Sequence, residues 1–134
     1  MTLSVIPLYA GLLAFMYVGL SARVILMRRK SGIVLGDSGD ITLTRRQRVH
    51  ANFAEYAPLA LVLLLMAELQ GAPVFVLHGL GILLIAGRVL HASGVSQEQE
   101  SAPFLHRVMG MALTFGVILI ASLMNIASVF PAFS

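Results

Sequence analysis

Four long apolar stretches, separated by short polar segments, run through the 134 residues of the chain. A helix that crosses the hydrocarbon layer of a bilayer needs about 20 mostly apolar residues, and each stretch meets that length. We therefore predict four membrane-spanning helices over about residues 3–27, 43–69, 73–92 and 103–130. No internal repeat or change in composition divides the chain, so residues 1–134 are expected to form a single all-α membrane domain.

The polar segments between these stretches carry the residues that end and start helices. The first, RRKSGIVLGDSGDITLTRR, is rich in glycine and aspartate, which suit turns. Thr42 or Thr44 is the expected N-cap of the second helix. The run from Gln70 to Pro73 predicts a tight stop and restart, and SGVSQEQESAP predicts a polar loop before the fourth helix.

Composition supports a lipid environment. Of all residues 58% are hydrophobic and 11% charged, and the mean hydropathy is +0.91. A soluble domain of this size leaves too much of its surface in water to hide so many apolar side chains. The net charge of +3 does not indicate nucleic acid as a partner, because the basic residues flank the apolar runs. The chain has no cysteine, which excludes disulfides, thiol catalysis and thiolate metal sites.

The distribution of basic residues predicts the orientation. All nine fall at helix ends that meet the two polar loops, and none lies at the opposite ends of the helices. By the positive-inside rule, both loops are expected on the cytoplasmic side and both termini outside, in a multi-pass membrane protein. The nine are Arg23, Arg28, Arg29, Lys30, Arg45, Arg46, Arg48, Arg88 and Arg107.

A polar stripe enters the second predicted helix. Arg45, Arg48, Asn52 and Glu55 are spaced by three, four and three residues and so share one helical face. A carboxylate that enters the bilayer is costly, so this face is expected against another helix or a water-filled cavity. Pro58 follows within the next turn and predicts a kink that opens space beside the stripe.

Each of the other helices brings an arginine to a similar depth on the same side: Arg23, Arg88 and Arg107. Several guanidinium groups with only one nearby acid indicate a pocket for an anion, because guanidinium pairs bidentately with carboxylate or phosphate. Glu55 would then neutralise an arginine or receive an ammonium group. A ligand with carboxylates and an amine, such as glutathione, fits this set.

The run from Arg48 to Pro58, RVHANFAEYAP, opens the second of four membrane helices and resembles the MAPEG family of membrane-associated proteins in eicosanoid and glutathione metabolism. The form here is most similar to the short bacterial members, which implies a location in the bacterial inner membrane. Weaker matches are Ser21-Ala22-Arg23, the run from Gly87 to Ala92, and the run from Arg107 to Gly110. The resemblance implies a left-handed four-helix bundle that assembles as a homotrimer, with glutathione as co-substrate between subunits near the cytoplasmic face.

The resemblance also implies the role of each site residue. Arg107 matches the arginine that stabilises the glutathione thiolate and is the catalytic candidate. His91 stands where several members have tyrosine, and the next tyrosine position is Val95 here. The implied partners are the chain itself, glutathione, membrane lipids and a hydrophobic small-molecule substrate, with neither metal nor haem. The implied glutathione-binding residues are Arg23, Arg48, Asn52, Glu55, Tyr56, Arg88 and His91.

The activity implied is glutathione transfer, or thiol-peroxidase chemistry, on a hydrophobic electrophile. Because of Val95, a non-catalytic member that binds glutathione or a lipid remains an alternative. A small multidrug exporter has similar size, but its proton relay needs an acid deep in the first helix, which is missing here. A haem bundle would need facing histidines. Although His50, His91 and His106 gather on one side, their spacing matches no metal motif.

Overall fold

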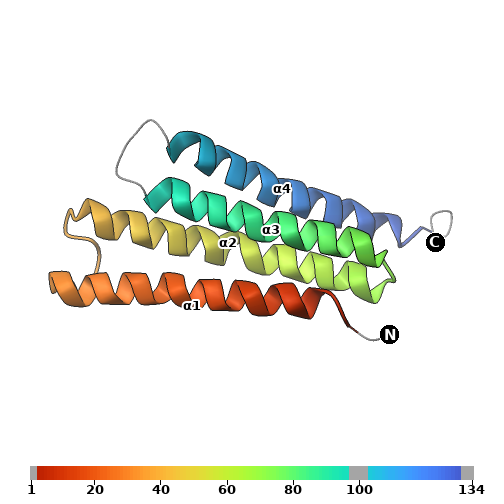
Figure 1. Cartoon of the computed structure of the whole chain (residues 1–134), viewed down its shortest axis with the longest axis horizontal. Helices are drawn as coiled ribbons and strands as arrows, with labels where there is room; N and C mark the ends of the chain where they lie inside the picture. Colours follow the sequence, from red (N-terminus) through yellow and green to blue (C-terminus); the bar gives the residue numbers. More distant parts are fainter. Residues whose placement is uncertain (1–2, 97–102, 131–134) are drawn as a thin grey trace.

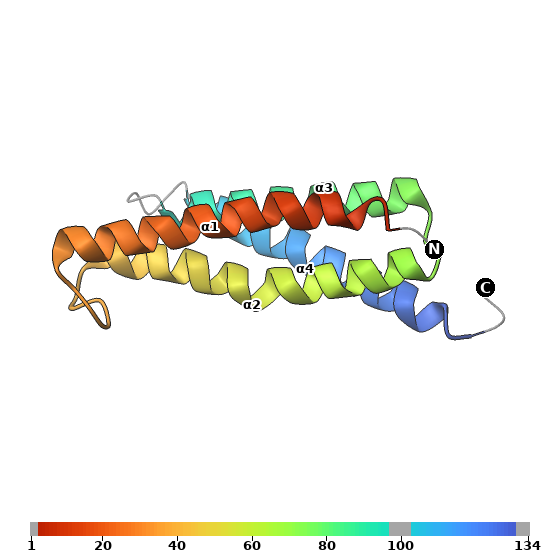
Figure 2. The same cartoon turned by 90° about the horizontal axis from the view of Figure 1, so that it is seen from below.

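Four α-helices lie side by side in the computed structural model, which describes residues 3–96 and 103–130 (Figure 1). All four are long and apolar enough to span a membrane, which confirms the predicted all-α membrane bundle. The helices α1 and α4 lie on opposite sides of the α2–α3 pair. Figure 1 and Figure 2 both show successive helices running in opposite directions along one long axis. Their bounds are Ile6–Ser31 for α1, Ile41–Leu69 for α2, Val74–Ser96 for α3 and Pro103–Ala127 for α4.

The helices extend differently from the prediction at several ends. Both α1 and α3 run four residues further than expected, to Ser31 and Ser96, because a helix need not stop where the hydrocarbon stops. Basic side chains in the last turn of α1 interact favourably with the helix dipole, and Gly32 then ends it with a left-handed φ of 67°. The fourth helix ends at Ala127, three residues earlier than predicted.

The N-cap of α2 is Asp40, not Thr42 or Thr44 as predicted. Its side chain accepts hydrogen bonds from the backbone amides of Thr42 and Leu43 at 2.9 and 3.0 Å. Threonine and aspartate are both good capping residues, so the sequence alone did not separate them. With Asp40 as the cap, the helix starts two residues before the predicted boundary.

The start of α1 is capped by a residue of another helix. Glu68, near the end of α2, accepts hydrogen bonds from the backbone amides of Ser4, Val5 and Ile6 at 2.7 to 2.8 Å. The N-cap residue Val5 has no side chain able to do this. One carboxylate therefore satisfies three of the amides that every helix leaves without partners at its start.

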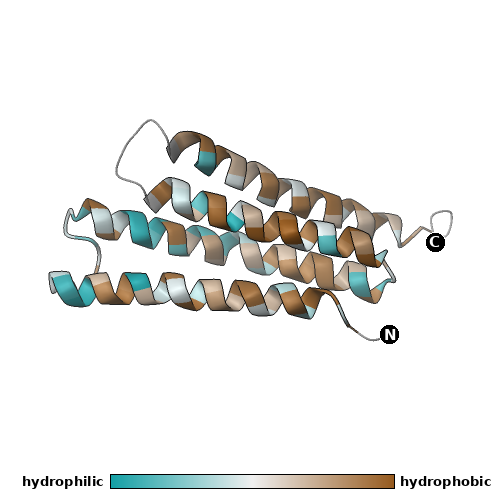
Figure 3. Ribbon diagram, in the orientation of Figure 1, coloured by the Kyte–Doolittle hydropathy of each residue, from teal (hydrophilic) through white to brown (hydrophobic). Residues whose placement is uncertain are grey.

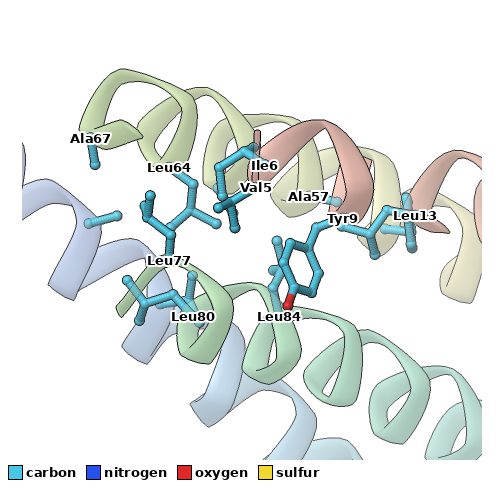
Figure 4. Packing of buried hydrophobic residues seen from close by; sticks show 14 of the residues in the cluster. Val5, Ile6, Tyr9, Leu13, Ala57, Leu64, Ala67, Leu77, Leu80 and Leu84 are labelled. Carbon is cyan, nitrogen blue, oxygen red and sulfur yellow. The ribbon is translucent and has the colours of Figure 1, made fainter. Parts of the chain in front are cut away.

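The core lies between the helices at the end away from the basic loops and along the middle of the bundle. Tyr9 and Leu13 of α1 belong to one buried cluster with Leu64 of α2 and with Leu77 and Leu84 of α3 (Figure 4). Large apolar side chains cover the outer faces of all four helices, where Phe15, for example, is 81% exposed. This arrangement suits lipid as the surrounding solvent.

Two glycines bring α3 and α4 into close contact. A Cβ on Gly110 would lie 2.5 Å from the backbone nitrogen of His91, and one on Gly87 would lie 3.0 Å from the carbonyl oxygen of Gly110. Small residues at helix contacts are the usual means of close packing in membranes. The backbones of α3 and α4 are thereby held together at the depth of Arg88 and His91.

Pro58 lies inside α2, which continues through it as a single helix to Leu69. An open apolar groove of about 440 Å³ lies beside Pro58 and is lined by residues of α1 and α2, Ala14 and Ala57 among them. This groove lies on the α1 side of α2, and none of the stripe residues lines it.

Candidate functional site

Hydrophilic residues gather at one end of the bundle, where α1 ends and α2 begins (Figure 3). We call this the basic end. The first turns of α2 and α4 and the last turns of α1 and α3 meet there, because successive helices run in opposite directions. The antiparallel arrangement of the helices therefore brings their four sets of basic residues to the same level.

The polar stripe of α2 divides into an inner and an outer edge. Asn52 is buried, with 9% of its surface exposed, and Arg45 is half-buried. Arg48 and Glu55 are exposed, and neither makes a hydrogen bond or ion pair with any residue in 3–96 or 103–130. A cation and a carboxylate two turns apart are thus left open to a ligand or to a second protein chain.

Arg88 is the most deeply buried charged residue of the site, with 1% of its surface exposed. Its Nη1 atom donates to Oδ1 of Asn52 at 2.7 Å, while Nε and Nη2 donate to the hydroxyl of Thr114 at 3.0 and 2.6 Å. Nη2 also lies 3.5 Å from the sulfur of Met111. These bonds tie α2, α3 and α4 together through one guanidinium group whose partners carry no charge.

His91 lies one turn beyond Arg88 on α3 and is 6% exposed. It lies within electrostatic range of three arginines that come from three helices, Arg48 of α2, Arg88 of α3 and Arg107 of α4. Tyr56 of α2 is half-buried, interacts electrostatically with Arg88, and packs edge-on against Phe115 at 5.3 Å. Arg48, Asn52 and Tyr56 of α2 and Arg107 of α4 thus each interact with Arg88 or His91 of α3.

The predicted residues of the two outer helices are Arg23 of α1 and Arg107 of α4. Arg107 is exposed near the start of α4, with its guanidinium carbon 5.7 Å from the ring centre of Phe104. Arg23 is exposed on α1, and its backbone carbonyl accepts a hydrogen bond from Arg46 at 3.1 Å. Because α1 and α4 lie on opposite sides of the bundle, Arg23 is separated from Arg107 by the α2–α3 pair.

The other three histidines, His50, His78 and His106, differ in their contacts. His50 stacks on Tyr17 and lies 3.0 Å from the hydroxyl of Ser21. His78 is half-buried, and its Nδ1 atom lies 2.8 Å from the hydroxyl of Tyr9, a polar contact between neighbouring helices of the kind found inside membranes. His106 has a buried Nδ1 atom that makes no hydrogen bond within the described ranges.

Sequence reasoning missed Thr114 and did not predict that Arg88 is buried inside the bundle. Thr114 is fully buried on α4 and accepts from Arg88 while donating to the carbonyl of Gly110 at 2.8 Å. The available signal was a lone threonine one turn after a helix-contact glycine. Val95, at a tyrosine position of the resembled family, packs against the apolar core.

The fold and this site define a four-helix membrane protein with a cluster of arginines at one end of its bundle. The sequence model of the MAPEG family matches residues 6–127, and the chain belongs to that family. It is similar to the inner membrane protein YecN of two Escherichia coli strains, with 35% identity in each case over 119 residues. That match covers 89% of this chain and 88% of the relative.

Proposed function

We propose that this protein binds glutathione at the basic end of the bundle and transfers it to a hydrophobic electrophile, or uses it to reduce one. The observation that carries the proposal is the convergence of Arg48, Arg88 and Arg107 on His91 from three helices. Three cations, with Glu55 as the one exposed acid among residues 3–96 and 103–130, favour an anionic ligand. Glutathione, with two carboxylates and one ammonium group, is complementary to that charge pattern.

Different side chains would take different parts of the ligand. Arg48 binds a carboxylate bidentately and Glu55 receives the ammonium group, since both side chains are exposed and open. Tyr56, His91 and the amide of Asn52 contact the peptide portion. Arg88 acts differently from the role that the family resemblance implies, because its donors are already engaged inside the bundle. It is a positioning residue that orients Asn52.

The chemistry requires a thiolate. A thiol has a reference pKa of about 8.5, and lowering it by about two units corresponds to roughly 2.7 kcal/mol of preferential stabilisation of the anion. Arg107, exposed beside the site and always charged, supplies that stabilisation. The thiolate sulfur attacks an electrophilic carbon, a carbon–sulfur bond forms, and the leaving group departs with its electron pair.

A hydroperoxide substrate follows a related course. The sulfur attacks the terminal oxygen and the alcohol leaves, which gives the sulfenic acid of glutathione. A second glutathione thiol condenses with this acid and releases water, so that two thiols are oxidised to a disulfide as the peroxide is reduced. Both reactions suit a substrate dissolved in lipid, because the exposed side of the site lies on membrane-spanning helices.

Assembly of the chain as a homotrimer accounts for Arg23. Within one protomer α1 and α4 are kept apart, so a ligand held by Arg107 meets an α1 arginine only if that arginine belongs to a neighbouring subunit. The exposed Arg48 and Glu55 then lie at the contact between protomers. The charge distribution and the similar inner membrane protein support an inner membrane location, with the basic end in the cytoplasm.

Isothermal titration of the purified full chain in nanodiscs with glutathione tests the proposal. Arg48→Gln is expected to weaken binding about tenfold to a hundredfold, because a charge-assisted hydrogen bond is worth about 1.5–3 kcal/mol. Arg45→Gln, on the same helix face and half-buried, is the matched control. If titration of the wild-type protein with glutathione shows no heat of binding, the proposal fails. Binding without conjugation of a chromogenic electrophile would support the non-catalytic alternative.

A further inference from the structure

The segment between α1 and α2 displays two large aliphatic side chains outside the membrane-spanning helices. Val34 and Leu35 are each 84% exposed, the highest values among the large apolar residues described. We call this pair the loop tip. Isolated exposed aliphatic residues are common on proteins, but two adjacent ones on a glycine-rich turn form an apolar point that water does not favour.

The conformation of the loop is fixed by hydrogen bonds from the helices on either side. Nη1 of Arg28, in the last turn of α1, donates to the carbonyl oxygens of Ile33, Val34 and Gly36 at 3.3, 3.2 and 3.0 Å. Gln47 of α2 donates to the same carbonyl of Gly36 at 3.1 Å. The exposure of the loop tip is therefore built into the structure of the loop.

The carboxylates of both acids in the loop, Asp37 and Asp40, accept hydrogen bonds from groups of the protein itself. Asp37 accepts from the amide of Gly39 at 3.0 Å and from the hydroxyl of Thr44 at 2.7 Å, and these bonds hold its pKa below the usual value. Asp40 caps α2 and also accepts from the hydroxyl of Ser31.

The two cations that precede the loop, Arg29 and Lys30, differ from these acids because their side chains have no partner among the described residues. Arg29 and Lys30 are exposed and have no hydrogen-bond or ion-pair partner in the part of the chain that the structure describes. The surface around the tip thus combines apolar side chains with positive charge whose counter-ions are not supplied by the protein.

The length of α1 sets the depth of this surface. Its 26 residues, at about 1.5 Å each, span about 39 Å, close to the 40–45 Å of a bilayer that includes its headgroup layers. The loop does not project beyond the bundle, because Figure 2 shows it leaving the line of the helices and turning back beside the first turn of α2. The tip therefore lies at the level of the lipid headgroups.

We propose that the loop tip inserts into the interfacial layer of the membrane, with Arg29 and Lys30 bound to the phosphates of anionic lipids. Aliphatic side chains bury in the boundary between headgroups and acyl chains, and lysine and arginine next to an anionic surface each favour binding. The partner is thus an anionic lipid surface and not a soluble ligand. This contact would anchor the basic end at a defined depth.

The sequence contains no tryptophan, so a single one reports on its own surroundings. Leu35→Trp replaces an exposed side chain and should leave the fold intact, which circular dichroism checks. In vesicles of phosphatidylglycerol and phosphatidylcholine, we expect blue-shifted emission, quenching by lipids brominated near the headgroup, and protection from aqueous acrylamide. Phe15→Trp, in the middle of α1, should instead be quenched most by bromines deep in the acyl chains.

Emission typical of water, with acrylamide quenching and none from brominated lipid, would overturn the proposal. Protection that varies with the protein-to-lipid ratio would also overturn it, because a second copy of the chain would then cover the tip. A further variant, Arg29→Gln with Lys30→Gln in the Leu35→Trp background, tests the charges. We expect the gain in brominated-lipid quenching on adding phosphatidylglycerol to be lost in this variant. An equal gain before and after the substitution would refute the headgroup contact.

Discussion

Thr114→Val removes one hydroxyl from the centre of the bundle and leaves a side chain of almost the same shape. Two guanidinium donors of Arg88, Nε and Nη2, then lose their acceptor in a place that water does not reach. A hydrogen bond to a charged group is worth about 1.5–3 kcal/mol, and Arg88 shifts to recover part of that loss. We expect Thr114→Val to lower the free energy of unfolding by about 3 kcal/mol.

Thr114→Ser is the matched control, because it keeps the acceptor oxygen and removes only a buried methyl group. That loss is about 1 kcal/mol, so the two variants should differ by about 2 kcal/mol, or roughly thirtyfold in the unfolding equilibrium constant. Titration of the purified protein with sodium dodecyl sulfate in mixed micelles, followed by far-ultraviolet circular dichroism, measures the difference. If Thr114→Val proves as stable as Thr114→Ser, the buried hydrogen bonds of Arg88 do not stabilise the bundle and the reasoning is refuted.

Three further outcomes are expected. Gly110→Ala should destabilise the α3–α4 contact by several kcal/mol. Gly116→Ala has nothing within 4 Å of the added Cβ, so it should be neutral or stabilise α4 by up to about 1 kcal/mol. Thermal unfolding of the two variants in detergent measures the difference. Glu68→Gln should cost about 1–2 kcal/mol and expose the first amides of α1 to faster hydrogen exchange, and unchanged exchange there would contradict the cap. Since the pKa of Asp37 is lowered in the fold, its contribution is present above its ordinary pKa of 3.8 and lost as pH falls through the lower folded value; carbon-13 titration of its carboxyl should show Thr44→Val moving that pKa upward.

The sequence was sufficient to predict the four helices, because the requirement for about 20 apolar residues per crossing is a property of the solvent. It was less informative about where helices end, since nothing forbids a helix from continuing into the headgroup layer, as α1 does to Ser31. The cap at Asp40 was missed because three good capping residues follow one another within five positions.

The candidate site was predicted as a set of residues but not as a geometry. Arg48 and Arg88 lie at comparable depths, yet one is exposed and the other buried, and no periodicity in the sequence distinguishes them. The difference comes from Gly87 and Gly110, which let α3 and α4 approach until Thr114 reaches the guanidinium group. A contact between helices that are distant in sequence is not encoded in the pattern of either helix alone.

The cap that Glu68 places on α1 has a consequence for how the chain is made. The first helix is synthesised with three amides at its start that find their carboxylate only when the end of α2 has been translated. Until then α1 has an incomplete terminus at the level of the membrane surface, and its wide apolar faces have only lipid to contact. The cap therefore favours insertion of α1 and α2 as a helical pair, and the close contact at the glycines of α3 and α4 favours their insertion as a second pair. Biogenesis of this protein would then proceed by hairpins and not by single helices.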